Sequence, residues 1–207
     1  MANHSPYHHG DLRSALLQEA NVMLRESGID GLSLRQLAER VGVSRMAPYH
    51  HFKDKHELLC ALAAEGFREL DKLIEQAAPA SSLETQELHT TLARFVRDYV
   101  HFAVDNPDRY ELMFGRPIWK GANPSAELKE TAFACFRHYA ERIGTLIGEQ
   151  RLPKGSKPLR LAQASWATLH GLCRLMIDGI YVNQTDMEEV SHEAVRLMLA
   201  VLTPNRG

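Results

Sequence analysis

The sequence predicts an all-α protein with nine helices. Apolar residues recur at spacings of three and four along nearly every segment, which is the period of a helix with one buried face. No segment keeps the strict alternation of apolar and polar residues that marks a strand. The chain has 207 residues, of which 44% are hydrophobic, so it is long enough to bury a core in two unequal domains.

Composition argues against several classes of protein. No apolar run reaches the roughly 18 to 20 residues of a membrane span, and the first residues lack the apolar stretch of a signal peptide, so we expect a cytoplasmic protein. The three cysteines lie on apolar stretches without a CxxC pair, which argues against a disulfide framework, a metal site or a cofactor held by them. The net charge of −2 gives no broad basic field, so any nucleic-acid surface must be local.

Capping residues delimit the first four predicted helices, which cover residues 11–27, 33–41, 44–51 and 54–77. Gly28 suits the left-handed position after the first helix. The hydroxyl of Ser33 can cap the second helix, and Asp54 with Glu57 can cap the fourth. Five further helices are predicted at about residues 88–106, 107–115, 128–147, 158–181 and 186–201, with a loop over 116–124. We divide the chain into domains of residues 1–56 and 57–207.

The segment from Leu32 to Leu59 has the spacing of a helix-turn-helix. Gly42 permits a tight turn, and Pro48 lies in the first turn of the following helix, where its missing N–H costs little. The apolar residues of this segment would form a small core: Leu34, Leu37, Ala38, Val43, Tyr49 and Phe52. The residues at the start of the second helix are then free to enter the major groove of DNA.

The same segment resembles the helix-turn-helix of TetR-family transcriptional regulators. The family pattern is matched by Leu37-Ala38, Gly42-Val43-Ser44, Tyr49, His51-Phe52, Lys55 and Leu58. Pro48 is a departure, because the family more often has an aliphatic residue there. Helix count and chain length extend the resemblance to the whole chain. It implies a homodimer that binds double-stranded operator DNA and a small-molecule effector.

The resemblance also implies which residues bind DNA. Arg45, Met46 and Ala47 would read bases, and Arg45 is the best candidate for a bidentate contact to guanine. Tyr49 would hydrogen-bond a phosphate, unless it is mainly a core residue, and Arg35 could be only a solvated charge. The full set of predicted DNA-binding residues is Ser33, Arg35, Ser44, Arg45, Met46, Ala47, Tyr49, His50 and Lys55.

Aromatic and methionine side chains are frequent on the helices of the second domain. For a TetR-like protein the resemblance implies an inducer site in this region, suited to a largely apolar or aromatic effector. The expected ligand-binding residues are Phe95, Tyr99, Phe102, Tyr110, Met113, Phe114, Trp119, Phe136, Tyr139, Trp166, His170 and Arg174. Such stripes are more often simply core, and this alternative stays open. Trp166, His170 and Gly171 resemble a signature of one C-terminal subtype in the family.

The last two predicted helices are the expected dimer interface. In the family these helices pack against their copies as a four-helix bundle. The interface candidates are Cys173, Ile177, Val190, Ala194, Leu197 and Met198, with core within one chain as the alternative.

The preferred interpretation is a ligand-responsive repressor of transcription, released from its operator by the effector. A DNA-binding or architectural factor without an effector is the alternative. An enzyme that uses Cys135 with His138, or His170 with Cys173, is not expected, because neither pair has an orienting partner, a phosphate loop or a set of metal ligands.

Overall fold

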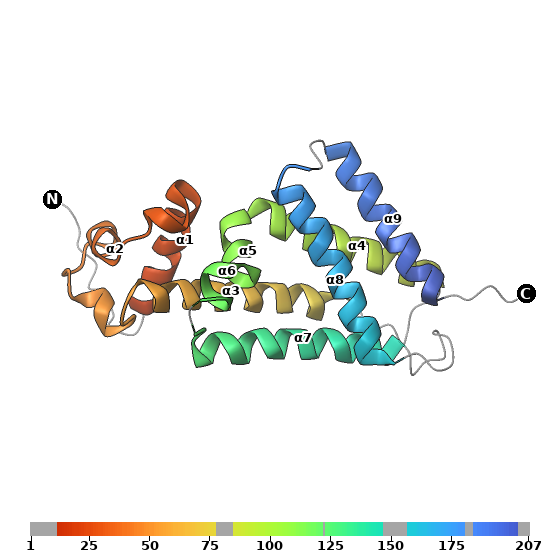
Figure 1. The fold of residues 1–207 in the computed structure, drawn as a ribbon, viewed down its shortest axis with the longest axis horizontal. Helices are drawn as coiled ribbons and strands as arrows, with labels where there is room; N and C mark the ends of the chain where they lie inside the picture. Colours follow the sequence, from red (N-terminus) through yellow and green to blue (C-terminus); the bar gives the residue numbers. More distant parts are fainter. Residues whose placement is uncertain (1–11, 78–84, 122, 147–156, 181–183, 203–207) are drawn as a thin grey trace, which may run out of the picture. The chain divides into compact units, whose positions relative to one another are not determined.

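The computed structural model describes residues 12–77, 85–121, 123–146, 157–180 and 184–202. Every regular element within these residues is helical, so the all-α prediction is confirmed. The elements of this part of the chain are α1 (Leu12–Gly31), α2 (Leu34–Val41), the 3-10 helix η1 (Ala47–His50), α3 (Lys55–Gln76), α4 (Thr85–Asp105), α5 (Pro107–Phe114), α6 (Arg116–Trp119), α7 (Ala126–Leu146), α8 (Pro158–Ile177) and α9 (Gln184–Leu202) (Figure 1).

The described chain forms two compact units. The first runs to Gly66 and includes Asp108–Glu130, whereas the second comprises Phe67–Pro107 and the chain from Thr131 onward. The units therefore divide α3 and α7, and the functional boundary between residues 56 and 57 stays a prediction. None of the helices in the described ranges is both long and apolar enough to cross a lipid bilayer.

The first unit is built on the packing of α2 against α1 and of η1 against α2. The core side chains of these elements and of early α3 are Leu16, Leu17, Ala20, Leu37, Ala38, Phe52, Leu58 and Leu62. Gly28 has the positive φ predicted for it, at 65°, but the chain then makes one more helical turn to Gly31. The end predicted for the first helix at residue 27 is thus a kink and not its end. Gly42 closes α2 in the left-handed conformation, with φ of 75°.

The two predicted helix caps have different outcomes. Ser33 precedes α2 with an extended backbone, but its side chain makes no capping hydrogen bond, so the predicted hydroxyl cap is wrong. The predicted cap of α3 is confirmed, because the Glu57 backbone N–H donates to Asp54 Oδ1 at 2.9 Å. The Glu57 carboxylate in turn accepts from the Lys53 N–H at 2.6 Å. These bonds satisfy donors that the helix itself leaves open.

One turn of helix replaces part of the loop predicted over residues 116–124. Arg116–Trp119 form α6, with Pro117 in the first turn, where a proline removes no helical hydrogen bond. The Trp119 indole Nε1 donates to the Met113 carbonyl at 2.7 Å and so ties α6 to α5. A side-chain to backbone bond of this kind is not visible in the local pattern of the sequence.

In the second unit α4 packs against both α8 and α9, and α8 packs against α9 (Figure 1). α8 ends at Ile177, four residues before the predicted end at Tyr181. Gly179 follows with a φ of 75°, a conformation that ends a helix readily. Tyr99, Leu169 and Cys173 are core residues of this unit.

Burial predicts that the three thiols react slowly. Cys60, Cys135 and Cys173 are free and buried, and burial raises the pKa of the Cys135 thiol to about 12. Since only the thiolate is nucleophilic, about one Cys135 in ten thousand is reactive at pH 8. We expect iodoacetamide at pH 8 to leave most of the folded chain unmodified in intact-mass spectra and to modify all three thiols after guanidinium denaturation. Rapid modification of the folded chain would contradict this burial.

Candidate functional site

The segment predicted as a recognition helix is a turn followed by one 3-10 turn. The predicted α-helix over residues 44–51 is therefore wrong in its geometry, although η1 lies inside it. The Ala47 N–H donates to the Ser44 carbonyl at 2.9 Å, and the Tyr49 N–H donates to the Met46 carbonyl at 3.1 Å. Pro48 has no N–H, so it cannot donate to Ser44 as an α-helix would require. Bonds between residues three apart are the result.

Most of the predicted DNA-binding residues are exposed on α2 and around η1. Met46 is 63% exposed and Tyr49 45% exposed, so Tyr49 is not mainly a core residue. Arg35, Ser44, Arg45 and His50 are also exposed, whereas Ser33, Ala47 and Lys55 are half-buried. Pro48 and Phe52 are buried within the same short segment. The segment thus exposes its polar and long side chains to solvent, while the buried side chains of Pro48 and Phe52 anchor it in the core of the first unit.

Two arginines of this surface are available to an anionic partner. Neither Arg35 nor Arg45 has an ion-pair partner among the described residues. Arg40 differs, because it pairs with Glu19 at 3.0 Å and with Glu26 at 2.7 Å, and its hydrogen bond lowers the pKa of the Glu26 carboxyl. The charge of Arg40 is therefore already compensated within the unit.

Lys55 makes a structural bond in addition to any role in DNA binding. Its Nζ donates to the Asp30 carbonyl at 3.1 Å, which links the start of α3 to the end of α1. An ammonium group has three donors, so this bond leaves two for a phosphate.

Arg13 and Phe52 fix η1 from within the first unit. The Arg13 guanidinium lies 5.7 Å from the centre of the Phe52 ring, within the range of a cation–π interaction. Arg13 Nη2 also pairs with Glu127 of α7 at 3.1 Å. Arg13 therefore links the Phe52 ring, just after η1, to α1 and through Glu127 to α7.

Five of the predicted ligand-binding residues pack on one another in the second unit. The Trp166 ring centre lies 4.9 Å from that of Tyr139, 5.5 Å from that of Phe136 and 6.0 Å from that of Tyr99. Phe95 in turn stacks on Tyr139 at 6.2 Å. These rings, from α4, α7 and α8, form what we call the aromatic cluster.

The hydroxyl of Tyr139 is the polar end of the aromatic cluster. It lies 2.8 Å from Ser165 Oγ, and burial raises the pKa of Tyr139 to about 12. Tyr139 is therefore neutral at physiological pH and can act as a hydrogen-bond donor. Phe102, His170 and Arg174 of the same unit are half-buried, and Arg174 pairs with Asp178 at 2.9 Å.

The remaining predicted ligand residues belong to the first unit: Tyr110, Met113, Phe114 and Trp119. Tyr110 and Met113 are fully buried, and the Tyr110 and Phe114 rings lie 4.7 Å apart. A Cβ added at Gly66 would meet Met113 Sδ at 2.5 Å, so α3 and α5 approach closely at this point. Met113 is a packing residue of the first unit.

The predicted interface residues are only partly on the surface of one chain. Cys173 and Ala194 are buried, Ile177 and Val190 are half-buried, and Leu197 is 57% exposed. The side chain of Met198 lies outside the described residues. The outer face of α8 instead carries Ala164, Ala167, Thr168 and Leu175, all exposed, and the half-buried Gly171.

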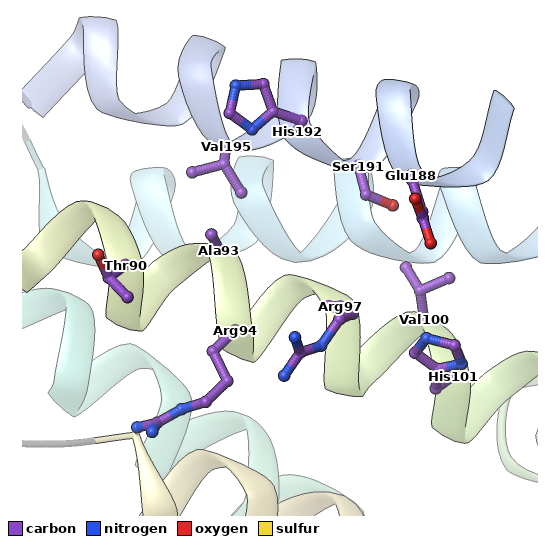
Figure 2. Close-up of a pocket in the computed structure, with 10 residues that line it drawn as sticks. All are labelled: Thr90, Ala93, Arg94, Arg97, Val100, His101, Glu188, Ser191, His192 and Val195. Carbon is purple, nitrogen blue, oxygen red and sulfur yellow. The ribbon is translucent and has the colours of Figure 1, made fainter. Parts of the chain in front are cut away.

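A groove lies between α4 and α9 (Figure 2). Its volume is about 350 Å³. It is lined from α4 by Thr90, Ala93, Arg94, Arg97, Val100 and His101, and from α9 by Glu188, Ser191, His192 and Val195. We call it the α4–α9 groove. None of these residues is among the predicted site residues, because the signal in the sequence is only a basic spacing, with Arg94, Arg97 and His101 on one face of α4.

A smaller hollow of about 230 Å³ shares Arg94 with this groove and is lined by Leu73, Gln76, Ala77, Thr91, Arg94, Phe95 and Asp98. Phe95 is the predicted ligand residue among them. No group of three or more His, Cys, Asp or Glu side chains that could hold a metal ion occurs in the described part of the chain.

Family models match both halves of the chain. The model for bacterial regulatory proteins of the tetR family matches residues 16–62, and the model for the tetracyclin repressor-like C-terminal domain matches residues 92–202. The chain belongs to the TetR family. The TetR-family models describe regulatory proteins and not enzymes, so the pairs Cys135–His138 and His170–Cys173 carry no catalytic assignment.

Curated TetR relatives are similar over part of their length. The tetracycline repressor protein class A from transposon 1721 of Escherichia coli is 31% identical over 133 residues, which are 62% of this chain and 54% of that protein. The class C repressor of Escherichia coli is 49% identical over 51 residues, 25% of this chain and 23% of that protein. The chain thus spans about half, or less, of these relatives.

Solved structures share the TetR fold over nearly the whole chain. A protein with unknown function from Rhodococcus sp. RHA1 is 32% identical, with a TM-score of 0.80 over 96% of this chain and 99% of that one. SmeT, the repressor of the Stenotrophomonas maltophilia multidrug efflux pump SmeDEF, is 20% identical, with a TM-score of 0.63 over 94% of this chain and 91% of that one. A second SmeT structure is a complex with triclosan. The likeness to SmeT shows the fold alone.

The bond between Tyr139 and Ser165 yields a test of the aromatic cluster. We expect Tyr139→Phe to lower the free energy of unfolding of the second unit by about 1 kcal/mol, the usual net value of a hydrogen bond. Ser165→Ala should cost more, roughly 1 to 3 kcal/mol, because it leaves the buried Tyr139 hydroxyl without this partner. Urea denaturation followed by Trp166 fluorescence, in a Trp119→Phe background, measures both.

Thr168→Ala is the matched control for this comparison. Its hydroxyl bonds the Ala164 carbonyl on the exposed face of α8, so the cost should stay below about 0.5 kcal/mol. Equal losses in the three variants would contradict the role given to the Tyr139–Ser165 bond.

Proposed function

We propose that this TetR-family chain is a dimeric repressor of transcription that reads operator DNA with the exposed residues of α2 and η1. The observation that carries the proposal is the contrast within residues 44–52, where Arg45, Met46 and Tyr49 are exposed while Pro48 and Phe52 are buried. A fixed backbone with outward polar and long side chains is what groove readout requires. The family models and the repressor names of its relatives support the same function. Because the matching family model describes bacterial regulatory proteins, and bacterial DNA lies in the cytoplasm, we place the chain there.

The roles on DNA follow from the chemistry of each side chain. Arg45 offers a bidentate donor pair to guanine, and Met46 offers an apolar contact to a thymine methyl group. Tyr49 and His50 donate to phosphates, as do the two N–H groups of Lys55 that do not bond Asp30. In this proposal residues 1–56 bind DNA, and residues 57–207 bind effector and form the dimer.

Binding to the DNA upstream of its own gene tests the operator-reading surface. We expect the wild-type protein to bind this DNA in gel shifts more tightly than random duplex, with an affinity that falls as salt rises. Arg45→Ala should weaken specific binding by roughly tenfold to hundredfold, because a bidentate base contact is worth about 1 to 3 kcal/mol. Tyr49→Phe should weaken binding to all sequences by a smaller factor.

Arg137→Ala serves as the control in the same gel shifts. Arg137 is an exposed arginine of α7 in the second unit, so its loss changes the net charge equally without touching the proposed surface. No preference of the wild type for the upstream DNA, or equal losses for Arg45→Ala and Arg137→Ala, would count against the proposal.

The dimer is proposed to form through the outer faces of α8 and α9. Ala164, Ala167 and Gly171 keep one side of α8 free of bulky side chains, and Leu197 exposes an apolar side chain on α9. Small residues allow two helices to approach closely, and apolar residues then gain from burial. If α8 and α9 pack against the same two helices of a second chain, the small residues of α8 and the side chain of Leu197 would both be buried.

Substitutions at Gly171 should change the association of two chains without destabilising the fold of one chain. A Cβ at Gly171 would meet nothing within 4 Å in the chain, so Gly171→Ala should fold and gain up to about 1 kcal/mol of helix propensity. In a closely packed dimer the same methyl group, and more so Gly171→Arg, should weaken association. Sedimentation velocity over a concentration series should show a dimer for wild type and monomers for Gly171→Arg.

Ala134→Arg on the exposed face of α7 provides the comparison for this test. It introduces the same side chain at a small exposed residue of the same unit, and it should remain dimeric. A dimer that persists in Gly171→Arg would place the interface elsewhere.

The effector is proposed to be small and largely apolar or aromatic, and to bind at the aromatic cluster so that operator affinity falls. The SmeT complex with triclosan shows that a neighbour of the same fold binds such a molecule. The close packing of the five rings favours the alternative, a DNA-binding factor without an effector, in which the cluster is only core.

A further inference from the structure

Met46 carries an exposed sulfur atom within the proposed DNA surface. Its side chain is 63% exposed, whereas the other methionines with described side chains are at most 9% exposed: Met23, Met113 and Met176. Met1 and the side chains of Met187 and Met198 lie outside the described residues. Oxidants in solution reach exposed sulfur atoms most readily, so Met46 is the most accessible of the four described thioethers.

The cysteine thiols compete poorly with this thioether for an oxidant. Cys60, Cys135 and Cys173 are all free and buried. Burial also raises the pKa of the Cys60 and Cys135 thiols, so their reactive thiolate form is scarce at neutral pH. A thioether has no proton to lose, and its lone pairs react without prior ionisation. Among the described sulfur atoms, that of Met46 should therefore react first.

We propose that Met46 is an oxidation site through which hydroperoxides release the protein from its operator. The inference rests on the proposed function, because it concerns the regulation of the same DNA surface. The sulfur lone pair attacks the terminal oxygen of the hydroperoxide, so that a sulfur–oxygen bond forms and the O–O bond breaks. The proton of the transferred hydroxyl passes to the departing oxygen, which leaves as water or an alcohol. Sulfur is oxidised by two electrons, and the hydroperoxide is reduced by the same two.

The position of Met46 makes this change matter for DNA binding and not for folding. Its carbonyl accepts the Tyr49 N–H at 3.1 Å, so its backbone belongs to the turn at η1. Its side chain is mostly in solvent, and oxidation there removes little packing. A sulfoxide is polar, and burying it against a thymine methyl group leaves its oxygen without a hydrogen-bond donor. Enzymes that reduce methionine sulfoxide would reverse the change.

Peptide mapping by mass spectrometry tests the selectivity of oxidation without DNA. After brief exposure of the full chain to hydrogen peroxide, Met46 sulfoxide should form severalfold faster than the sulfoxides of Met23, Met113 and Met176. In guanidinium the four rates should become similar, because burial no longer protects the other three. Equal rates in the folded chain would overturn the proposal.

Gel shifts test the release of DNA, with duplexes that the untreated wild type selects from a random pool. The oxidised protein should bind these duplexes roughly tenfold more weakly, because it buries an unpartnered polar group at a base edge. Its melting temperature should stay that of the untreated protein. The two methionine sulfoxide reductases, one for each epimer, should restore the affinity, which they would not do for a damaged fold.

Met46→Leu separates this site from other effects of peroxide. Leucine is apolar and close to methionine in volume, so the variant should still bind the selected duplexes and should lose no affinity on oxidation. Met176→Leu, at a buried methionine of α8, is the matched control and should stay as sensitive as wild type. Peroxide sensitivity that persists in Met46→Leu, or Met46 sulfoxide without loss of affinity, would overturn the proposal. A wild type that selects no sequence would instead overturn the proposed function, and with it the release step, while the peptide map still decides whether Met46 is the oxidation site.

Discussion

The burial of Pro48 and Phe52 is the constraint on which the candidate DNA surface depends. The segment between α2 and α3 makes only a few backbone hydrogen bonds, each closing a single turn. A turn of this length is not stable on its own, because little enthalpy offsets the lost conformational freedom. The buried side chains of Pro48, inside the turn, and Phe52, just after it, restrain the backbone of this segment in place of further hydrogen bonds. Arg13 extends that restraint by covering the Phe52 ring.

The ends of this segment are also held by polar contacts. Gly42 closes α2 in a conformation that most residues avoid, and Asp54 caps α3 on the far side. Between these fixed points the exposed side chains share a backbone that has little freedom to adjust. Recognition by a rigid surface loses less entropy on binding than recognition by a mobile loop. The short length of η1 is therefore compatible with selective binding.

Local chemistry explains what could be predicted from the sequence. The helical period, Gly42 and the Asp54–Glu57 cap depend on residues close together in the chain, and all three were predictable. The 3-10 form of η1 was missed, because the sequence analysis places Pro48 in the first turn of a helix, although an α-helix that begins at Ser44 would need a donor N–H at that position. The aromatic residues show one pattern whether they line a cavity or fill a core. The α4–α9 groove depends on two helices about ninety residues apart in sequence, and a basic spacing on one of them does not reveal the other.

The close approach at Gly66 restricts how the first unit can change over evolution. A Cβ at this position would meet the sulfur of Met113 at 2.5 Å, so the buried Met113 side chain would have to shift, or be replaced by a shorter one, to make room. Losing the methionine alone would leave a void, which is also unfavourable in a packed core. A substitution of Gly66 alone or of Met113 alone is thus expected to make the protein less stable. Homologues should consequently change these two positions together, and their covariation would be independent evidence that α3 and α5 meet at this point.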